Sequence, residues 1–132
     1  MKFTFLLFLL FTITNISAQE IVTLVKKDSI YNSVEIERKP EYPDGMEAFY
    51  KLISANFVIP KDKGFRGGKI FLSFVVEKDG SLVDIKVLRD PGFGTGIEAV
   101  RVLRKFKKWI PAEQKGVKVR CEYMLPIAIR SL

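Results

Sequence analysis

The chain has 132 residues, of which 48% are hydrophobic, and it carries a formal net charge of +7. This length predicts one small domain. The sequence contains no histidine and one cysteine. That composition excludes Ser-His-Asp and Cys-His catalysis, imidazole zinc sites and an internal disulfide, so the fold must depend on packing alone.

The N-terminal stretch has the pattern of a secretory signal peptide. Lys2 gives a positive start, Phe3–Ile13 is apolar, and small residues end at Ala18. The apolar run is shorter than the roughly 20 residues that a membrane span needs. We therefore expect residues 1–18 to be a signal peptide that exports the chain. The pattern leaves open a second possibility, in which this stretch is retained as an N-terminal membrane anchor.

The following residues predict a short N-terminal segment at 19–33 and a folded domain at 34–132. Apolar residues cluster at Ile21–Val25, and apolar and charged residues alternate over Val34–Arg38. Both patterns favour short strands.

A β-hairpin is the clearest local prediction. Gly68–Arg89 contains two apolar runs around the turn sequence Glu77–Ser81, in which Asp-Gly supplies the conformation that a tight turn needs. Period-two alternation predicts that each run buries one face. The expected inward residues are Ile70, Leu72, Phe74 and Val76 in the first run and Val83, Ile85 and Val87 in the second.

Two amphipathic helices are predicted on either side of this hairpin. The first begins at Asp44, with Glu47 completing a capping box, and ends before Pro60. The second follows Thr95, where Glu98 completes another capping box. Helical spacing predicts two buried faces. They consist of Met46, Phe49, Tyr50, Ile53 and Phe57 in the first helix, and of Ile97, Val100, Leu103 and Phe106, flanked by Ala99 and Val102, in the second.

Basic residues crowd the end of the second helix. They are Arg101, Arg104, Lys105, Lys107 and Lys108. Such a cluster can bind nucleic acid or a lipid surface, but it lacks an aromatic platform and the chain is expected to be exported. A solvated face is therefore the preferred interpretation, and we expect no nucleic-acid partner. Trp109, where the helix ends, is expected to plug the core beside the sheet.

A long strand is predicted at Val117–Ile129. Pro126 cannot donate a ladder hydrogen bond, so we expect this strand to lie at a sheet edge, at least from Pro126 onward. An exposed edge invites pairing with another chain, and Val117–Leu125 is the candidate edge. Cys121 lies within this apolar strand and is expected to be a buried, unreactive residue.

The ordered set of motifs resembles the TonB C-terminal domain, in the version common in Bacteroidota-type bacteria. The motifs are Pro40–Pro43 (PEYP), the hairpin Val75–Ser81 (VVEKDGS), Trp109–Pro111 (WIP) and Leu125–Ile127 (LPI). The resemblance implies an α+β fold, in which an antiparallel sheet of a central hairpin and a C-terminal edge strand carries two helices on one face. From the residues themselves we expect no catalytic residue, cofactor or metal.

The resemblance also implies a mechanical function in the periplasm. Such a domain grips an extended segment, the TonB box, of an outer-membrane TonB-dependent transporter, while an inner-membrane motor supplies energy if the chain is anchored. Strand addition at an open edge is the expected mode. The expected contact residues are Val117, Lys118, Val119, Arg120, Cys121, Glu122 and Tyr123. Lys118 and Arg120 either attract an acidic peptide or are ordinary edge charges that block unwanted pairing.

Another function class remains open at this stage. A stand-alone structural envelope protein would use the same edge to form a homodimer, or would bind peptidoglycan. An enzyme is not expected, because no nucleophile–base pair, paired carboxylates or cofactor loop is evident.

Overall fold

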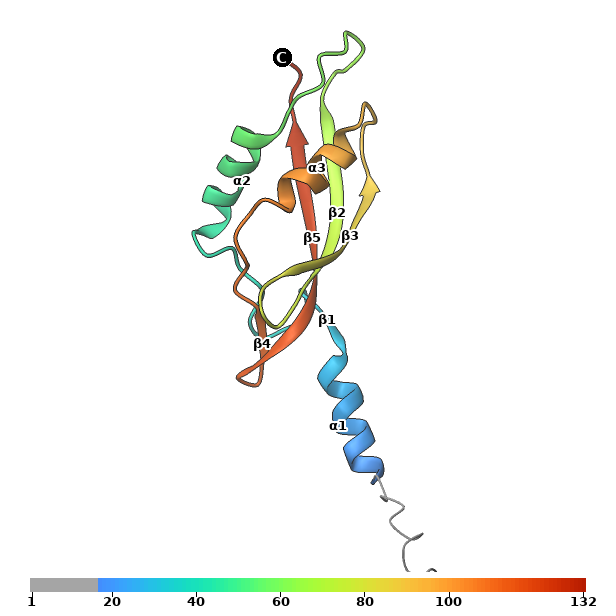
Figure 1. The fold of residues 1–132 in the computed structure, drawn as a ribbon, viewed down its shortest axis with the longest axis vertical. Coiled ribbons are helices and arrows are strands. Elements are labelled where there is room, and N and C mark those ends of the chain that lie inside the picture. Colours follow the sequence, from blue (N-terminus) through green and yellow to red (C-terminus); the bar gives the residue numbers. More distant parts are fainter. Residues whose placement is uncertain (1–16) are drawn as a thin grey trace, which may run out of the picture.

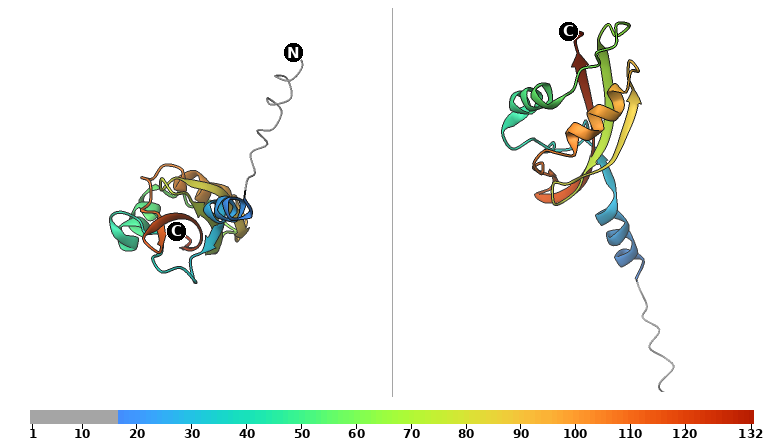
Figure 2. Two further views of the ribbon diagram at one scale, coloured as in Figure 1. Left: turned by 90° about the horizontal axis from the view of Figure 1, so that it is seen from below. Right: turned by 45° about the horizontal axis from the view of Figure 1, so that its top comes forward.

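The computed structural model describes residues 17–132, so the predicted signal peptide falls outside the described residues except for Ser17 and Ala18. The elements follow in chain order: α1 (Ala18–Asp28), β1 (Ile30–Asn32), α2 (Gly45–Asn56), β2 (Gly68–Val76), β3 (Leu82–Arg89), α3 (Thr95–Leu103), β4 (Ala112–Gln114) and β5 (Val117–Ile129). The predicted α+β class is confirmed. Figure 1 shows α1 projecting away from the rest of the molecule, and Figure 2 shows this from other directions.

The sheet has the strand order β1-β5-β2-β3, and β4 pairs separately with β5. β2 and β5 form the longest ladder, which is antiparallel and runs from Gly68↔Ile129 to Val76↔Cys121. β1 adds in parallel to Arg120–Glu122, and β4 pairs antiparallel with Val117–Val119. β5 therefore lies inside the sheet over Val117–Glu122, and the expectation that the candidate edge Val117–Leu125 is open is wrong for these six residues. The N-terminal segment supplies the strand that covers part of it.

The predicted hairpin is confirmed, with one irregularity. At its turn, Gly80 N–H donates to the Glu77 carbonyl at 2.8 Å, and the Asp79 carboxylate accepts from the Ser81 N–H at 2.9 Å. The Ser81 hydroxyl also donates to the Asp79 carboxylate at 2.6 Å, and the two bonds from Ser81 hold the pKa of Asp79 down at about 2. The expected strict alternation of the second run fails because Asp84 has a positive φ of 50° where the register shifts. Such a bulge reorients the side chains that follow it.

The main core lies between the sheet and helices α2 and α3. It is formed by the buried residues Tyr42, Phe49, Ile53, Phe57, Ile70, Leu72, Phe74, Val76, Ala99, Val102, Leu103, Trp109, Leu125 and Ile127. Rings meet edge-on at its centre, where the Trp109 ring lies 5.2 Å from Phe49 and 5.4 Å from Phe74 between centroids. The predicted plug role of Trp109 is confirmed.

The buried face of α3 is rotated from the prediction. Ala99, Val102 and Leu103 are buried, whereas Ile97 is 80% exposed. Spacing three alone does not fix the phase of a helix with 3.6 residues per turn, and Gly96 sets it here by packing closely against Val87 and Asp90. Neither predicted capping box forms a side-chain cap. Asp44 instead pairs with Lys107 at 3.3 Å, and Glu98 pairs with Arg101.

Neither predicted N-terminal strand is present. Ile21–Val25 lies within α1, because a short apolar run does not by itself distinguish strand from helix. Val34–Arg38 begins with a turn, in which the Asn32 side chain accepts from the Val34 N–H at 2.9 Å. Asparagine commonly bonds the backbone two residues on and so starts a turn. Only an isolated bridge from Arg38 to Glu113 remains of the expected strand.

Candidate functional site

The outward side of β5 changes from paired to open along its length. The Ser33 N–H donates to the Glu122 carbonyl at 3.2 Å, which shows that the backbone N–H and C=O groups of Glu122 point toward β1 and away from β2. Backbone groups alternate in direction along a strand, so Met124, Pro126 and Ala128 also direct theirs away from β2. No strand of residues 17–132 pairs with them on that side. We call Met124–Ile129 the open edge.

Helix α2 lies beside the open edge. The Tyr50 hydroxyl donates to the Pro126 carbonyl at 3.2 Å, which occupies one of the outward-pointing acceptors. Burial raises the pKa of Tyr50 above its usual value, so the hydroxyl remains a donor at neutral pH. The prediction of a sheet edge from Pro126 onward agrees with the observed pairing, since no strand in the described part of the chain pairs with the outer side of β5 beyond Glu122.

A groove separates α2 from the last part of β5. It has a volume of about 410 Å³ and is lined by Tyr50, Ile53, Ser54, Lys69, Pro126, Ile127, Ala128 and Ile129. A second hollow of about 260 Å³ shares Ser54, Ala128 and Ile129 with it and is lined by Phe57, Ile59 and Arg130 as well. We call the two together the α2–β5 groove. Its floor is largely apolar, and its two charged lining residues, Lys69 and Arg130, are both basic.

The predicted contact residues are divided between two environments. Val119 and Cys121 are buried with Ile36 and Ala112 in a small second cluster. Tyr123 stacks on Phe74 with 5.6 Å between ring centroids. Burial raises the pKa of the Cys121 thiol to about 11, so the thiol is neutral and unreactive at physiological pH. Val117, Lys118 and Glu122 are exposed.

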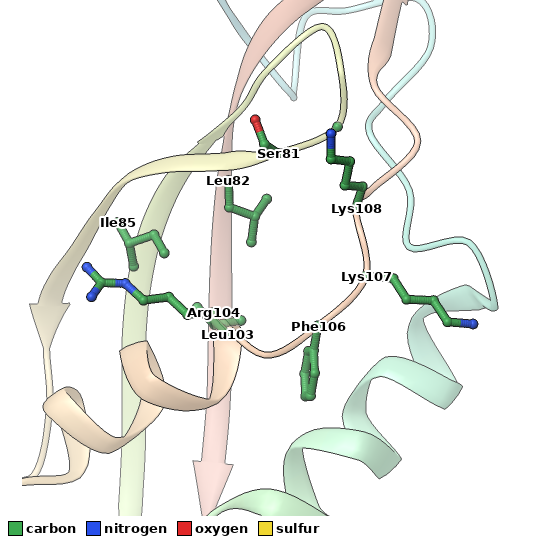
Figure 3. A pocket seen from close by; sticks show the side chains of 9 residues that line it. Ser81, Leu82, Ile85, Leu103, Arg104, Phe106, Lys107 and Lys108 are labelled. Atoms are coloured by element: carbon green, nitrogen blue, oxygen red, sulfur yellow. The ribbon is translucent and has the colours of Figure 1, made fainter.

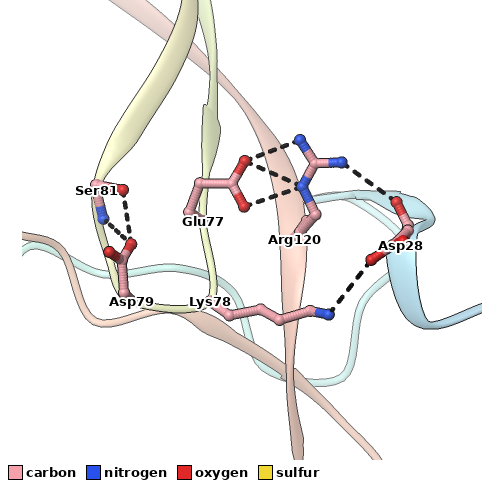
Figure 4. A network of polar contacts seen from close by, with 6 residues as sticks. All are labelled: Asp28, Glu77, Lys78, Asp79, Ser81 and Arg120. Carbon is pink, nitrogen blue, oxygen red and sulfur yellow. Dashed lines mark hydrogen bonds and ion pairs between the residues drawn. The ribbon is translucent and has the colours of Figure 1, made fainter.

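Arg120 is the centre of a polar network that ties β5 to the hairpin and to α1 (Figure 4). Its guanidinium binds both carboxylate oxygens of Glu77, with Nη2 2.8 Å from Oε1, and this pairing raises the pKa of Arg120. Arg120 Nη1 also donates to the Asp28 carbonyl at 3.3 Å. Arg120 was expected either to attract an acidic peptide or to block unwanted pairing as an edge charge. Its position matches neither interpretation, because Arg120 is a structural ion-pair partner of Glu77 within the fold.

The basic residues beyond α3 surround a hollow of about 230 Å³ between α3 and the start of β3. Lys107 pairs with Asp44 at 3.3 Å and Lys108 with Asp79 at 3.4 Å. Figure 3 shows the charged ends of Arg104 and Lys107 pointing in opposite directions. The charges do not converge on one point as a phosphate or nucleic-acid site requires, which favours the solvated-face interpretation.

Residues 17–132 contain neither a metal-binding cluster nor a membrane-spanning helix. No group of three Cys, Asp or Glu side chains there is arranged to hold a metal ion. In the same residues, no helix has the length and apolar character needed to cross a membrane.

The residues of the α2–β5 groove were not predicted from sequence. Tyr50 and Ile53 were assigned to the core face of a helix, and Pro126 was treated as the end of the candidate edge. The available signal was Pro126 itself, because proline within a strand marks an edge that lacks a neighbour. The groove forms only when α2 packs beside β5, and no local sequence pattern predicts that packing.

The architecture is that of a small α+β domain whose last long strand has a partly open edge. The family model for the C-terminal region of Gram-negative bacterial TonB proteins matches residues 63–129, just over half of the chain. The chain belongs to this family, and the resemblance inferred from its motifs is confirmed.

A similar solved structure is the NMR solution structure of the Helicobacter pylori TonB-CTD (residues 194–285), with 24% identity and a TM-score of 0.42. The alignment covers 63% of this chain and 89% of that one. Curated protein sequences give no match.

Proposed function

We propose that this protein is a periplasmic binding module that grips an extended segment of an outer-membrane TonB-dependent transporter, the TonB box, by strand addition at β5. The observation that carries the proposal is the open edge, where the N–H and C=O groups of Met124 and Ala128 face outward and no strand of the described residues 17–132 lies beside them. An unpaired edge of this kind accepts an extended peptide through main-chain hydrogen bonds. Inner-membrane motor proteins would act through the chain only if its N-terminus is anchored.

We propose a contact further along β5 than the sequence suggested. The originally expected residues Val117–Tyr123 are paired with β4 and β1 over Val117–Glu122. A partner that adds to the molecule as it stands therefore meets Met124–Ile129 first. About six residues at 3.3 Å each give roughly 20 Å of edge, which is the length of an ordinary strand.

The α2–β5 groove supports the same location and supplies a means of selection. Side chains of an added strand alternate in direction, so every second one would face α2, over the apolar floor formed by Ile53 and Ile127. Lys69 and Arg130 would attract an acidic residue of the partner. Main-chain bonds would then hold the segment, and the groove would select it.

The test is a titration of the ¹⁵N-labelled protein with a synthetic TonB-box peptide of about ten residues. We expect amide shifts at Met124, Ala128 and Ile129 and a smaller change in the Tyr50 ring signals. Ala128→Pro removes one outward N–H, and Ala128→Val keeps it in a residue that suits strands. Ala128→Pro should weaken binding at least tenfold relative to Ala128→Val. Unchanged shifts along β5 at saturating peptide, or equal binding by both variants, would refute the proposal.

Self-association through the same edge is the second candidate function, because an open edge pairs as readily with a copy of the chain. Sedimentation over a concentration series separates the two functions. A dimer that Ala128→Pro abolishes and the peptide leaves intact would favour a self-associating envelope protein. A monomer that binds the peptide would favour the transporter-binding module.

A further inference from the structure

The N-terminal strand β1 occupies the same side of β5 as the open edge. The Glu122 carbonyl points to Ser33, and the Pro126 carbonyl points to Tyr50. Both therefore point away from β2, which pairs with the opposite side of this stretch of β5. β1 covers Arg120–Glu122, and the open edge begins at Met124. The two stretches are consecutive parts of the same edge of β5, the one that faces away from β2.

The described contacts of this N-terminal segment lie near solvent. β1 has three residues, and Ile30 is 47% exposed. Tyr31 packs on the small second cluster and not on the main core. Asp28 reaches Lys78 at 4.0 Å with a side chain that is 83% exposed (Figure 4). An exposed ion pair of this kind contributes little stability.

We propose that α1 and β1 together form a strap that covers the first part of the docking edge, so that its release lengthens the edge from Met124–Ile129 to Arg120–Ile129. This inference rests on the proposed function and concerns the regulation of the same site. The strap binds β5 as a partner segment would, through strand pairing, and it is tethered to the body by one turn. A partner segment longer than the open edge must displace the strap to pair along all of Arg120–Ile129.

The geometry also explains why release is separable from unfolding. None of the residues of α1 and β1 whose side chains the structure describes lies in the main core. Segments with few buried contacts open locally, at a lower free energy than the global transition. After release, the β2–β5 and β2–β3 ladders and both core helices keep their contacts. The strap is therefore a mobile cover on a stable sheet.

The test uses the full chain with two substitutions at one position. Ser33→Pro removes the N–H that bonds the Glu122 carbonyl, and Ser33→Ala keeps it. We expect Ser33→Pro to speed amide exchange at Tyr31 and Glu122 at least tenfold over Ser33→Ala. The synthetic TonB-box peptide should bind Ser33→Pro three- to tenfold more tightly, and its amide shifts should extend to Arg120 and Glu122.

A second substitution protects the test against misfolding. Tyr31→Ser removes the packing of β1 and leaves its backbone intact, and it should produce the same direction of change. Far-UV circular dichroism checks that the variants keep the sheet. Equal peptide affinity of Ser33→Pro and Ser33→Ala, with shifts confined to Met124–Ile129 in both, would overturn the strap.

The two proposals fail in different ways. If the peptide binds no variant, the docking proposal fails, and hydrogen exchange alone decides the strap. Exchange of Tyr31 and Ser33 at a lower free energy than residues at the centre of β2 would support detachment of β1. Exchange of these amides only through global unfolding would overturn it.

Discussion

Gly80 is the point at which the hairpin turn touches the segment that follows α3, and its substitution tests the packing of the whole domain. It has a positive φ of 85°, and its carbonyl accepts from the Trp109 N–H at 2.8 Å. A Cβ at this position would lie 1.9 Å from the Trp109 carbonyl oxygen. Gly80→Ala must therefore push the turn away from Trp109.

Gly116 provides the matched control. It has a similar positive φ of 74° in the turn between β4 and β5, and a Cβ there would meet nothing within 4 Å. Both substitutions incur the left-handed penalty of about 1–2 kcal/mol. Gly80→Ala also loses a hydrogen bond of about 1 kcal/mol and part of the packing of a buried tryptophan, whose full removal costs about 3–5 kcal/mol. We expect a loss of about 4 kcal/mol for Gly80→Ala and about 1 kcal/mol for Gly116→Ala.

Urea unfolding, followed by far-UV circular dichroism and tryptophan fluorescence, measures both losses. The chain contains a single tryptophan, so the emission of Trp109 reports directly on the affected contact. The wild-type domain should have a total stability of about 5–15 kcal/mol, which makes the predicted difference easy to resolve. Equal losses in the two variants, or unchanged emission of folded Gly80→Ala, would refute the described contact.

Two other buried groups give further predictions. The indole N–H of Trp109 is buried without a hydrogen-bond partner among the described residues. Trp109→Phe should therefore lower the free energy of unfolding by at least about 2 kcal/mol less than Trp109→Ala in the same urea assay. Equal losses in the two variants would contradict this. Burial raises the pKa of Cys121 to about 11, so between pH 9 and 11 the unfolded thiol ionises while the folded thiol stays protonated, and stability should fall as pH rises. Cys121→Ala should reduce this slope, and iodoacetamide should label folded Cys121 at least tenfold more slowly than the urea-unfolded chain at pH 9.

The sequence predicts the local elements well where a clear hydrophobic period is bounded by turn-forming or helix-ending residues. The hairpin follows from two alternating runs around an Asp-Gly turn, and α2 follows from a helical stripe that ends before Pro60. Most apolar residues predicted on these faces are buried, among them Phe49, Ile53 and Leu72. Tyr50 and Val87 are exceptions, because each is more than a third exposed. These features depend on residues that are close in sequence, and local patterns contain that information.

The prediction fails where distant segments decide the outcome. β1 has three residues and pairs with positions about 90 residues later, and no period is measurable in so short a strand. Its presence changes β5 from an edge strand to an internal one over Arg120–Glu122. The bulge at Asp84 and the rotated face of α3 likewise result from packing against neighbours. The expected contact residues and the open edge lie on the same strand, but the sequence does not distinguish the occupied part of that strand from the open part.

Pro126 explains how the open edge avoids indiscriminate pairing. Proline has no N–H to give, and its carbonyl already accepts from Tyr50. Of the three outward-facing residues, only Met124 and Ala128 therefore offer both backbone groups. A copy of the chain or an arbitrary strand would find the ladder interrupted at its centre, which is one way in which natural sheets protect an edge. A segment that docks here must compensate through its side chains, and the α2–β5 groove lies where those side chains would go. Under the docking proposal, selectivity comes from the same proline that weakens the edge, because main-chain bonding alone is insufficient there.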